Sequence, residues 1–268
     1  MSGTTIVTGG TSGLGKAIAD QLVAAGRSVV IVARNPNGGQ PNSALVGDLA
    51  RMAETARIAA EASSRHPDLD VLINNAGVSK FERVLTTDGL ETTFATNHMA
   101  PFLLSNLLLP ILQRNRGVIL NITSEQHRWV RRIPWEDLQG ETRFNPIEPY
   151  NLTKLYNVLF TFEMARRVES SGVTVSCVSP GFLRTNLGRE ARGAFRAFLT
   201  LARPFQQPPE VGARVVIKAL EARASGAYFR GRKQVAPGPL ATDIRAAMRL
   251  WQVSRELAGS RLDGESTR

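Results

Sequence analysis

The chain has 268 residues, of which 43 % are hydrophobic and 21 % are charged, and its formal net charge is +10. This composition is too apolar for a disordered chain and is typical of a globular protein. No apolar run approaches the roughly 18–20 residues that cross a bilayer, and the first apolar strand follows Met1 too closely for a signal peptide. The single cysteine, Cys177, excludes an intramolecular disulfide, so we expect a cytoplasmic protein without a transmembrane segment.

The excess positive charge lies mainly in the second part of the chain. Residues 121–268 hold 23 basic and 14 acidic side chains, whereas residues 1–120 hold 10 and 9. A basic protein invites comparison with nucleic-acid and membrane-surface binders. However, the sequence contains no compact run of Lys and Arg and no nucleic-acid-binding motif. We therefore expect no nucleic-acid partner, and a nucleic-acid- or membrane-binding module is only a third alternative.

Short apolar runs rich in β-branched residues recur along the chain and predict strands. These runs are Thr5–Thr8, Ser28–Ala33, Ala44–Val46, Val71–Asn74, Val118–Ile122 and Val173–Val178. Between the first two runs, Leu14, Ile18 and Leu22 recur at intervals of four residues, which is helical spacing. Strands that are apolar on both faces and alternate with helices are typical of a parallel sheet wrapped by helices. The sequence therefore predicts a doubly wound, Rossmann-type α/β fold in a single domain that spans residues 1–268.

A glycine-rich turn follows the first predicted strand. It reads Thr8-Gly9-Gly10-Thr11-Ser12-Gly13-Leu14-Gly15 and has the spacing G-x-x-x-G-x-G. Glycines at these positions let the backbone turn tightly and approach a pyrophosphate, which the amino end of the following helix attracts. The turn predicts a dinucleotide site, and an ordinary turn without a ligand is the alternative.

Tyr150 and Lys154 lie four residues apart at the start of a predicted helix, so they share one helix face. A free phenol has a pKa of about 10, and lowering it by about three units requires roughly 4 kcal/mol of preference for the phenolate. One ammonium group at about 4 Å supplies that order of energy at an effective dielectric constant of about 20. The pair is therefore able to form a proton donor or acceptor poised near neutrality, although a chance match of the spacing stays open.

Together with other segments, these residues resemble the short-chain dehydrogenase/reductase family over nearly the whole chain. The segments that carry the resemblance are Thr8–Gly15, Asn74-Asn75-Ala76-Gly77, Asn97, Ser124, Tyr150 with Lys154, and Pro180-Gly181. Three further segments look like the retinol-dehydrogenase-like branch of that family, namely Asp137-Leu138-Gln139-Gly140, the run 154–160 and the run 250–254. That branch reduces or oxidises lipophilic carbonyl compounds and alcohols with NADP(H).

The resemblance implies a role for each of four catalytic residues. Tyr150 is the general acid for ketone reduction or the base for alcohol oxidation. Lys154 lowers the pKa of Tyr150 and holds the nicotinamide ribose. Ser124 hydrogen-bonds the substrate oxygen as charge develops on it. Asn97 supports a water-linked proton relay to Lys154.

The resemblance also implies the residues that bind the cofactor, which we expect to be NADP(H) rather than NAD(H). These are Gly9, Thr11, Ser12, Gly13, Leu14, Gly15, Arg34, Asp48, Leu49, Asn75, Ala76, Gly77, Tyr150, Lys154, Pro180, Gly181, Leu183 and Thr185. An acidic residue after the second strand would repel a 2′-phosphate, but the chain has Ala33-Arg34-Asn35 there. The Arg34 guanidinium is able to bind that phosphate with charge-assisted hydrogen bonds, and a solvated loop arginine is the alternative. The stretch 34–42 is rich in turn residues, so we expect the second crossover to lack its helix.

A lid over the substrate is expected near residues 185–210, where helical spacing places an apolar stripe beside an arginine stripe. The stripes consist of Phe195, Phe198, Leu199 and Ala202, and of Arg189, Arg192, Arg196 and Arg203. The apolar stripe would seal the pocket while the arginines attract an acidic substrate. An ordinary surface helix with solvated charges is the alternative.

The expected function is hydride transfer between nicotinamide and a ketone, aldehyde or secondary alcohol on a lipophilic small molecule. The alternative is a non-catalytic NADP(H) sensor on the same fold, although such sensors usually lack the Tyr or the Lys. The long separation of Ser124 and Tyr150, which contains the insertion 127–149, leaves both a homodimer and a monomer open. No metal is expected, because His98 and His127 are not spaced as metal ligands.

Overall fold

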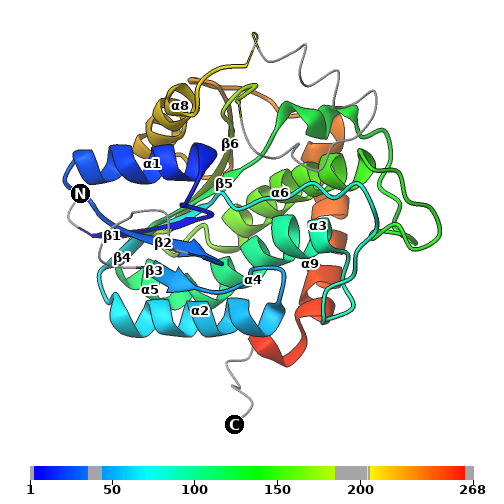
Figure 1. The fold of residues 1–268 in the computed structure, drawn as a ribbon, viewed down its shortest axis with the longest axis horizontal. Helices are drawn as coiled ribbons and strands as arrows, with labels where there is room; N and C mark the ends of the chain where they lie inside the picture. The colour runs from blue at the N-terminus through cyan, green and yellow to red at the C-terminus, as the bar shows by residue number, and fades with distance from the viewer. Residues whose placement is uncertain (1–2, 36–43, 185–203, 205, 263–268) are drawn as a thin grey trace.

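The computed structural model describes residues 3–35, 44–184, 204 and 206–262, which are built around one eight-stranded sheet (Figure 1). The strand order is β3-β2-β1-β4-β5-β6-β7-β8, and all neighbours are parallel except the antiparallel pair of β7 and β8. The strands are β1 (Thr4–Thr8), β2 (Ser28–Ala33), β3 (Ala44–Val46), β4 (Leu69–Asn74), β5 (Val118–Ile122), β6 (Thr174–Ser179), β7 (Ala227–Arg230) and β8 (Lys233–Gln234). The predicted α/β fold with a largely parallel sheet is therefore confirmed.

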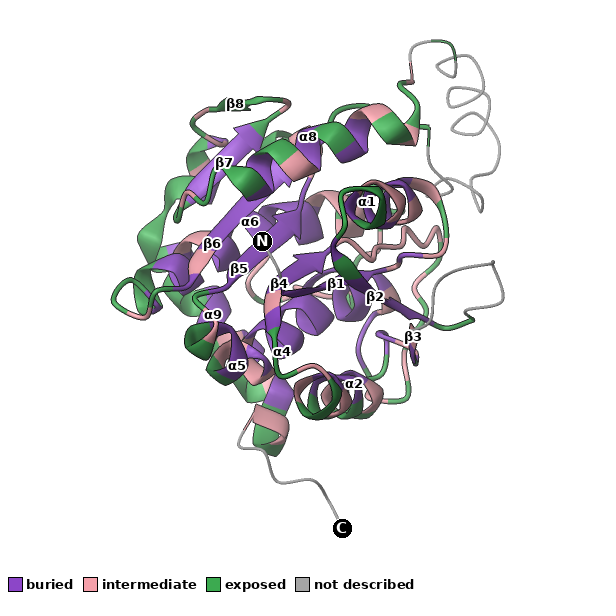
Figure 2. Ribbon diagram, turned by 90° about the vertical axis from the view of Figure 1, so that its left-hand side faces the viewer, coloured by how far each residue is buried: buried purple, intermediate pink, exposed green. Residues whose placement is uncertain are grey.

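Helices cover both faces of this sheet (Figures 1 and 2). Helices α1 and α8 pack together on one face, and α2, α4, α6 and α9 cover the other. The α-helices are α1 (Gly13–Ala24), α2 (Met52–Arg65), α3 (Thr92–Phe94), α4 (Ala100–Leu107), α5 (Leu109–Arg114), α6 (Glu148–Arg167), α8 (Pro209–Glu221) and α9 (Ile244–Ala258). Shorter turns are the π-helix Ala95–Met99 and the 3₁₀ helices Glu125–Trp129, Pro239–Thr242 and Gly259–Leu262. Every helix in the described ranges is too short or too polar to cross a bilayer.

The alternation of side chains along the strands divides the core into two layers. In β1, Ile6 belongs to the layer beneath α2, α4 and α6, whereas Val7 belongs to the layer beneath α1 and α8. Helix α1 buries Leu14, Ile18 and Leu22, as the helical spacing predicts. Because both faces of the central strands are covered, their sequences are continuous apolar runs rather than alternating ones.

All six predicted strands are present, with boundaries within two residues of those predicted. The strands β7 and β8 were not predicted, because they are short and end in exposed polar side chains such as Arg230 and Gln234. The turn-rich stretch 34–42 falls mostly outside the described residues. The expectation that its crossover lacks a helix therefore stays a prediction.

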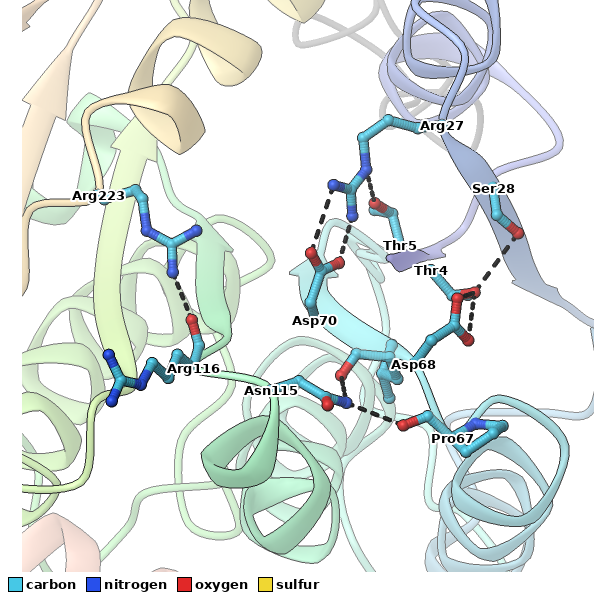
Figure 3. A network of polar contacts seen from close by, with 11 residues as sticks. Thr4, Thr5, Arg27, Ser28, Pro67, Asp68, Asp70, Asn115, Arg116 and Arg223 are labelled. Atoms are coloured by element: carbon cyan, nitrogen blue, oxygen red, sulfur yellow. Dashed lines mark hydrogen bonds and ion pairs between the residues drawn. The ribbon is translucent and has the colours of Figure 1, made fainter. Parts of the chain in front are cut away.

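Polar side chains connect three strands at the amino end of the sheet (Figure 3). Arg27, which precedes β2, is buried, forms an ion pair with Asp70 of β4 and donates from Nε to Oγ1 of Thr5 at 2.9 Å. Thr4 Oγ1 donates to the carboxylate of Asp68 at 2.9 Å. A buried charge is tolerated only when it is paired and hydrogen-bonded, so these contacts fix β1, β2 and β4 relative to one another. They lie at the opposite end of the sheet from the glycine turn.

Helix α9 packs across α4 and α6 through aromatic rings. The Trp251 ring centroid lies 5.0 Å from that of Phe102 and 5.9 Å from that of Phe160. The Arg167 guanidinium lies over the same indole, 4.4 Å from its centroid. Trp251 is buried in this arrangement and closes the core on the side of α9.

Candidate active site

The glycine turn and the loop after β4 meet where the strand order reverses. From β1 the chain builds β2 and β3 on one side and then returns to place β4 on the other side of β1. Ligands of open α/β sheets bind at such a switch point, outside the carboxyl ends of the strands. The turn 9–15 follows β1 and residues 75–77 follow β4, so the candidate site begins between these loops.

The glycine turn has the backbone geometry of a phosphate cradle. Gly9 and Gly13 adopt φ angles of +67° and +53°, in the left-handed region that favours glycine. A Cβ atom on Gly15 would collide with the Gly9 carbonyl and the Asn75 amide, because α1 begins so close to the turn. The first turn of α1 carries no acidic residue, and the Ser12 side chain makes no capping hydrogen bond. The positive end of α1 is therefore free of a protein anion and fits the pyrophosphate of a dinucleotide.

Thr8 and Asn75 connect the two loops. Oγ1 of Thr8 accepts hydrogen bonds from the backbone N–H groups of Asn75 and Ala76, both at 2.9 Å. The Asn75 side-chain amide donates to the Thr8 carbonyl at 2.8 Å. Asn75 therefore braces the glycine turn, and Ala76 and Gly77 continue the same half-buried loop.

The residues expected around the adenine lie next to this loop pair. Arg34, which the sequence analysis assigns to a phosphate on the ribose, is exposed directly after β2. Asp48 follows β3, and its carboxylate accepts a hydrogen bond from the Ala50 N–H at 3.0 Å. Leu49 is buried beside it. In the glycine turn Thr11 is half-buried, Ser12 is exposed and Leu14 is buried.

The residues expected around the nicotinamide follow β6. Pro180 is buried, and Gly181 is exposed with a φ angle of +103°. Leu183 is buried and forms an isolated β-bridge with Gln207. Thr185 and most of the expected lid, residues 185–203 and 205, lie outside the described residues. The two stripes of that lid therefore stay predictions.

Ser124, Tyr150 and Lys154 come together at the carboxyl end of β5. Ser124 lies two residues after β5, and Tyr150 and Lys154 lie one turn apart near the start of α6. The Ser124 side chain lies close enough to the Tyr150 hydroxyl to act on its pKa. Lys154 Nζ lies 5.3 Å from the centroid of the Tyr150 ring and donates to the Ile122 carbonyl at 3.1 Å. The structure thus brings together the three residues that the sequence analysis placed at the centre of the chemistry.

Burial dominates the acid–base properties of this group. It raises the pKa of Tyr150 to about 12, and the nearby Ser124 side chain acts in the opposite direction. Burial also lowers the pKa of Lys154 to about 8, because the ammonium loses its hydration. The sequence analysis expected Lys154 to poise Tyr150 near neutrality, whereas the chain by itself keeps the phenol protonated. The difference arises because desolvation of the phenolate outweighs the stabilisation that its neighbours provide.

Asn97 lies in the π-helix Ala95–Met99 and joins the loop after β4 to α6. Its side chain accepts from the Val78 N–H at 2.8 Å and donates to the Val78 carbonyl at 2.9 Å. It also donates to Oγ1 of Thr153 at 3.1 Å, and that hydroxyl donates to the Tyr150 carbonyl at 2.9 Å. Asn97 is fully buried. The fourth expected catalytic residue therefore contacts the helix that carries Tyr150 and Lys154.

Buried polar residues that the sequence analysis did not single out hold this arrangement. Thr123 donates from Oγ1 to the Lys154 carbonyl at 2.9 Å. Asn157 donates from Nδ2 to the Asn97 carbonyl at 2.8 Å. Both side chains are buried. The available signal was a polar residue within a segment whose neighbours are apolar, because such residues need an internal hydrogen-bond partner.

A separate hollow of about 640 Å³ lies beneath the insertion that precedes α6. It is lined by residues of the stretch 131–149 together with Leu152, Leu240, Asp243 and Ala246. Trp135, one of its lining residues, contacts the Arg249 guanidinium at 4.5 Å from the ring centroid. Ser124 and Tyr150 do not line this hollow. The insertion therefore lines a hollow to which the start of α6 contributes Glu148, Pro149 and Leu152, but not Tyr150.

Comparison with known proteins identifies the family of this chain. The family model described as short chain dehydrogenase matches residues 3–194. The chain belongs to the short-chain dehydrogenase family. This short-chain dehydrogenase is an oxidoreductase of a family that uses a nicotinamide cofactor.

Two curated relatives place the short-chain dehydrogenase in the retinol-dehydrogenase-like branch. Retinol dehydrogenase 13 of Homo sapiens is 36 % identical over 280 residues, which cover 96 % of this chain and 84 % of the relative. Retinol dehydrogenase 14 of Homo sapiens is 32 % identical over 289 residues, which cover 96 % and 86 %. Among solved structures, a protein from Mycobacterium paratuberculosis matches with a TM-score of 0.76 and 28 % identity, covering 96 % of this chain and 93 % of that one. The branch indicated by the sequence is confirmed.

Proposed function

We propose that this short-chain dehydrogenase is an NADP(H)-dependent oxidoreductase that interconverts a ketone or aldehyde and the corresponding alcohol on a lipophilic small molecule. The observation that carries the proposal is the meeting of three side chains: Ser124 lies close enough to Tyr150 to lower its pKa, and Lys154 Nζ lies 5.3 Å from the phenol ring centroid. These three residues lie at the carboxyl end of β5, and the glycine turn lies at the carboxyl end of β1 on the same edge of the parallel sheet. The relatives are named for retinol, a lipophilic alcohol, which supports the substrate class. Both Tyr150 and Lys154 are present, which favours an enzyme over a non-catalytic sensor.

In the direction of reduction, each residue has a separate task. When bound at the glycine turn, the cofactor supplies the hydride that the carbonyl carbon receives. Ser124 donates a hydrogen bond from Oγ to the substrate oxygen as negative charge develops there. Tyr150 transfers the proton of its Oη to that oxygen, and the Lys154 ammonium stabilises the phenolate that remains. Asn97 supports the water-linked relay that returns a proton through Lys154.

The acid–base properties of the site support reduction. With a pKa of about 12, Tyr150 is almost entirely protonated at neutral pH, so the proton donor is present. With a pKa of about 8, most Lys154 side chains carry a charge at pH 7 and are able to stabilise the phenolate. Alcohol oxidation needs the deprotonated phenol, which burial disfavours in the chain alone.

Substitution at Tyr150 tests the proposed chemistry. Tyr150→Phe removes the transferable proton and keeps the ring, so we expect nearly complete loss of turnover with NADPH binding largely retained. Lys154→Met should damage both rate and cofactor affinity, because the proposal gives Lys154 two tasks. Turnover of lipophilic aldehydes and ketones would be followed by NADPH absorbance, and binding by fluorescence titration. Near-normal turnover in Tyr150→Phe would contradict the assignment of Tyr150 as the acid.

Substitution of Arg34 tests whether the protein prefers NADPH over NADH. A hydrogen bond to a charged group contributes about 1.5–3 kcal/mol, which corresponds to roughly 10- to 100-fold in affinity. We expect the wild type to bind NADPH more tightly than NADH by that factor, and Arg34→Ala to lose most of the difference. Titration of both proteins with both cofactors measures it. Equal affinities in the wild type would refute the proposed preference.

A further inference from the structure

The turn that follows Ser124 contains a buried histidine for which the proposed chemistry has no use. His127 lies in the 3₁₀ helix Glu125–Trp129 and is only 1 % exposed. Its Nδ1 atom lies 2.6 Å from the Ser124 carbonyl oxygen. Its Nε2 atom lies 3.0 Å from the backbone nitrogen of Gly238, in the segment that follows β8. One imidazole therefore joins the backbone of Ser124 to a segment more than one hundred residues further along the chain.

These two partners define the protonation state of His127. A carbonyl oxygen can only accept a hydrogen bond, so Nδ1 must carry the proton. A backbone N–H can only donate, so Nε2 must present its lone pair to Gly238. A doubly protonated ring would direct a second N–H against the Gly238 N–H. Burial lowers the pKa of His127 and Arg128 acts in the same direction, whereas the Ser124 carbonyl and Glu125 favour the charged form.

Neighbouring groups prevent the ring from turning away. Tyr228 of β7 packs against the His127 ring edge to face, with centroids 5.2 Å apart. The Tyr228 hydroxyl donates to the Glu125 carboxylate, which also forms ion pairs with Arg128 and Arg230 at 3.4 and 3.5 Å. These contacts connect the turn after Ser124 to β7. The ring is thereby fixed in one orientation.

The fixed ring determines how Ser124 is presented. The Ser124 carbonyl accepts from the His127 ring and also from the His127 backbone N–H at 3.2 Å. Holding this carbonyl restricts rotation about the Cα–C bond of Ser124, which is its ψ angle, and so fixes the direction of the Cα–Cβ bond relative to the turn. The Ser124 Oγ accepts from the Gln126 N–H at 3.3 Å, and the side chain lies close enough to Tyr150 to lower its pKa.

We propose that His127 is a positioning residue which, as the neutral tautomer protonated on Nδ1, holds the Ser124 hydroxyl toward Tyr150 and couples it to the segment at Gly238. The inference rests on the proposed function, because only that function gives the Ser124 hydroxyl a substrate oxygen to bind. His127 acts through Ser124 and has no contact with substrate in this proposal.

Replacing His127 by asparagine or glutamine tests its two hydrogen bonds separately, because each amide side chain is able to replace only one of the two ring nitrogens. In His127→Asn, Nδ2 is able to occupy the position of Nδ1 and donate to Ser124, whereas the acceptor for Gly238 is lost. In His127→Gln, Oε1 is able to accept from Gly238, whereas the donor to Ser124 is lost. His127→Leu removes both. Arg128→Gln is the matched control. It removes the bond of Arg128 to the Ala236 carbonyl at 2.6 Å and one of the two ion pairs of Glu125, while Tyr228 and Arg230 still hold Glu125 and both bonds of His127 remain.

The first measurement is the reduction of a lipophilic aldehyde, such as decanal or retinal, with NADPH. We expect kcat to fall about tenfold in His127→Leu and His127→Gln, because one hydrogen bond of this kind corresponds to about that factor. His127→Asn should recover most of the rate that His127→Leu loses, and Arg128→Gln should stay close to the wild type. KM for NADPH should change less than about twofold in all four. Equal loss of kcat in the Asn and Gln variants would overturn the proposal.

The second measurement needs no turnover. The chain has three tyrosines, so the NMR spectrum of protein labelled with ¹³Cζ-tyrosine contains few resonances. The resonance that is absent in Tyr150→Phe belongs to Tyr150. We expect this resonance to move toward its Ser124→Ala position in His127→Leu and His127→Gln, and to stay near the wild-type position in His127→Asn. An unmoved resonance in His127→Leu would refute the positioning role. If the wild type reduced no carbonyl compound while the resonances followed the expected order, the proposed function would fail and the positioning of Ser124 would stand.

Discussion

His98 should make this protein less stable as the pH falls from about 6.5 to about 4. The side chain is fully buried in the π-helix, and its Nε2 lies 2.8 Å from Oγ of Ser254 on α9. Phe94 and Tyr156 surround the ring, each with its centroid 5.5 Å away. Burial lowers the pKa of His98 from 6.5 to about 4, and the neighbouring Asn157 side chain opposes this shift. His98 is therefore neutral in the folded protein at every pH above about 4.

The magnitude follows from the two pKa values. Between pH 6.5 and about 4, His98 binds a proton in the unfolded chain but not in the folded one, so acid favours unfolding. One pKa unit corresponds to about 1.4 kcal/mol, which gives a total cost of about 3 kcal/mol below pH 4. By pH 5 the cost should already be about 2 kcal/mol. The stability of the folded protein is therefore not reduced by His98 above pH 6.5, and it decreases as the pH falls from 6.5 to about 4.

Urea unfolding at pH 7.5, 6 and 5 measures this effect in the wild type and in His98→Gln. Glutamine is able to keep a donor near the position of Nε2 but does not titrate, and the other ionisable groups are the same in both proteins. The free energy of unfolding of the wild type relative to His98→Gln should therefore fall by about 2 kcal/mol from pH 7.5 to pH 5. His66→Gln is the control, because His66 is only half-buried. A difference between wild type and His98→Gln that did not change with pH would refute the reasoning.

Two further predictions concern the opposite ends of the sheet. Gly15→Ala should destabilise the fold by about 1–3 kcal/mol and weaken NADPH binding, because its Cβ would collide with the Gly9 carbonyl; thermal unfolding and cofactor titration measure this. Asp70→Asn should cost about 3 kcal/mol in urea unfolding, because it leaves the buried Arg27 guanidinium without its anion. In Glu61→Gln, which removes the two ion pairs of Glu61 with Arg57 and Arg65 on the surface of α2, the change should stay within about 1 kcal/mol. A cost for Asp70→Asn as small as that of Glu61→Gln would show that the buried pair is not important.

The part of the fold that the sequence predicts is the part whose strands are buried on both faces. The runs that became β1, β2, β4, β5 and β6 are apolar because helices cover both sides, so their composition alone reveals them. Strand β8 has two exposed polar residues, and its position depends on hydrogen bonds with β7 that no local pattern encodes. Strand pairing of this kind is a property of the folded chain.

The candidate site also has a part that the sequence predicts and a part that it does not. Tyr150 and Lys154 were predicted from their chemistry and helical spacing, and Ser124 from the resemblance to the family; the structure brings these three together. Burial reverses the expected direction of the Tyr150 pKa shift, and the extent of burial cannot be read from a spacing of four residues. His127 was considered only as a metal ligand. Its contact with Gly238 joins two segments whose separation in sequence gives no local signal.

The packing of Trp251 of α9 on Phe102 and Phe160 has a consequence for self-association. Phe102 of α4 and Phe160 of α6 are covered by Trp251 of the same chain. A second copy could reach these rings only after α9 had moved away, which would expose the Trp251 indole and separate it from Arg167. The ring contacts of Trp251 within one chain thus compete with any contact that a second copy would make with Phe102 and Phe160. A dimer that keeps α9 in place must use other surfaces. The emission of Trp251 would report which of these two situations holds in solution.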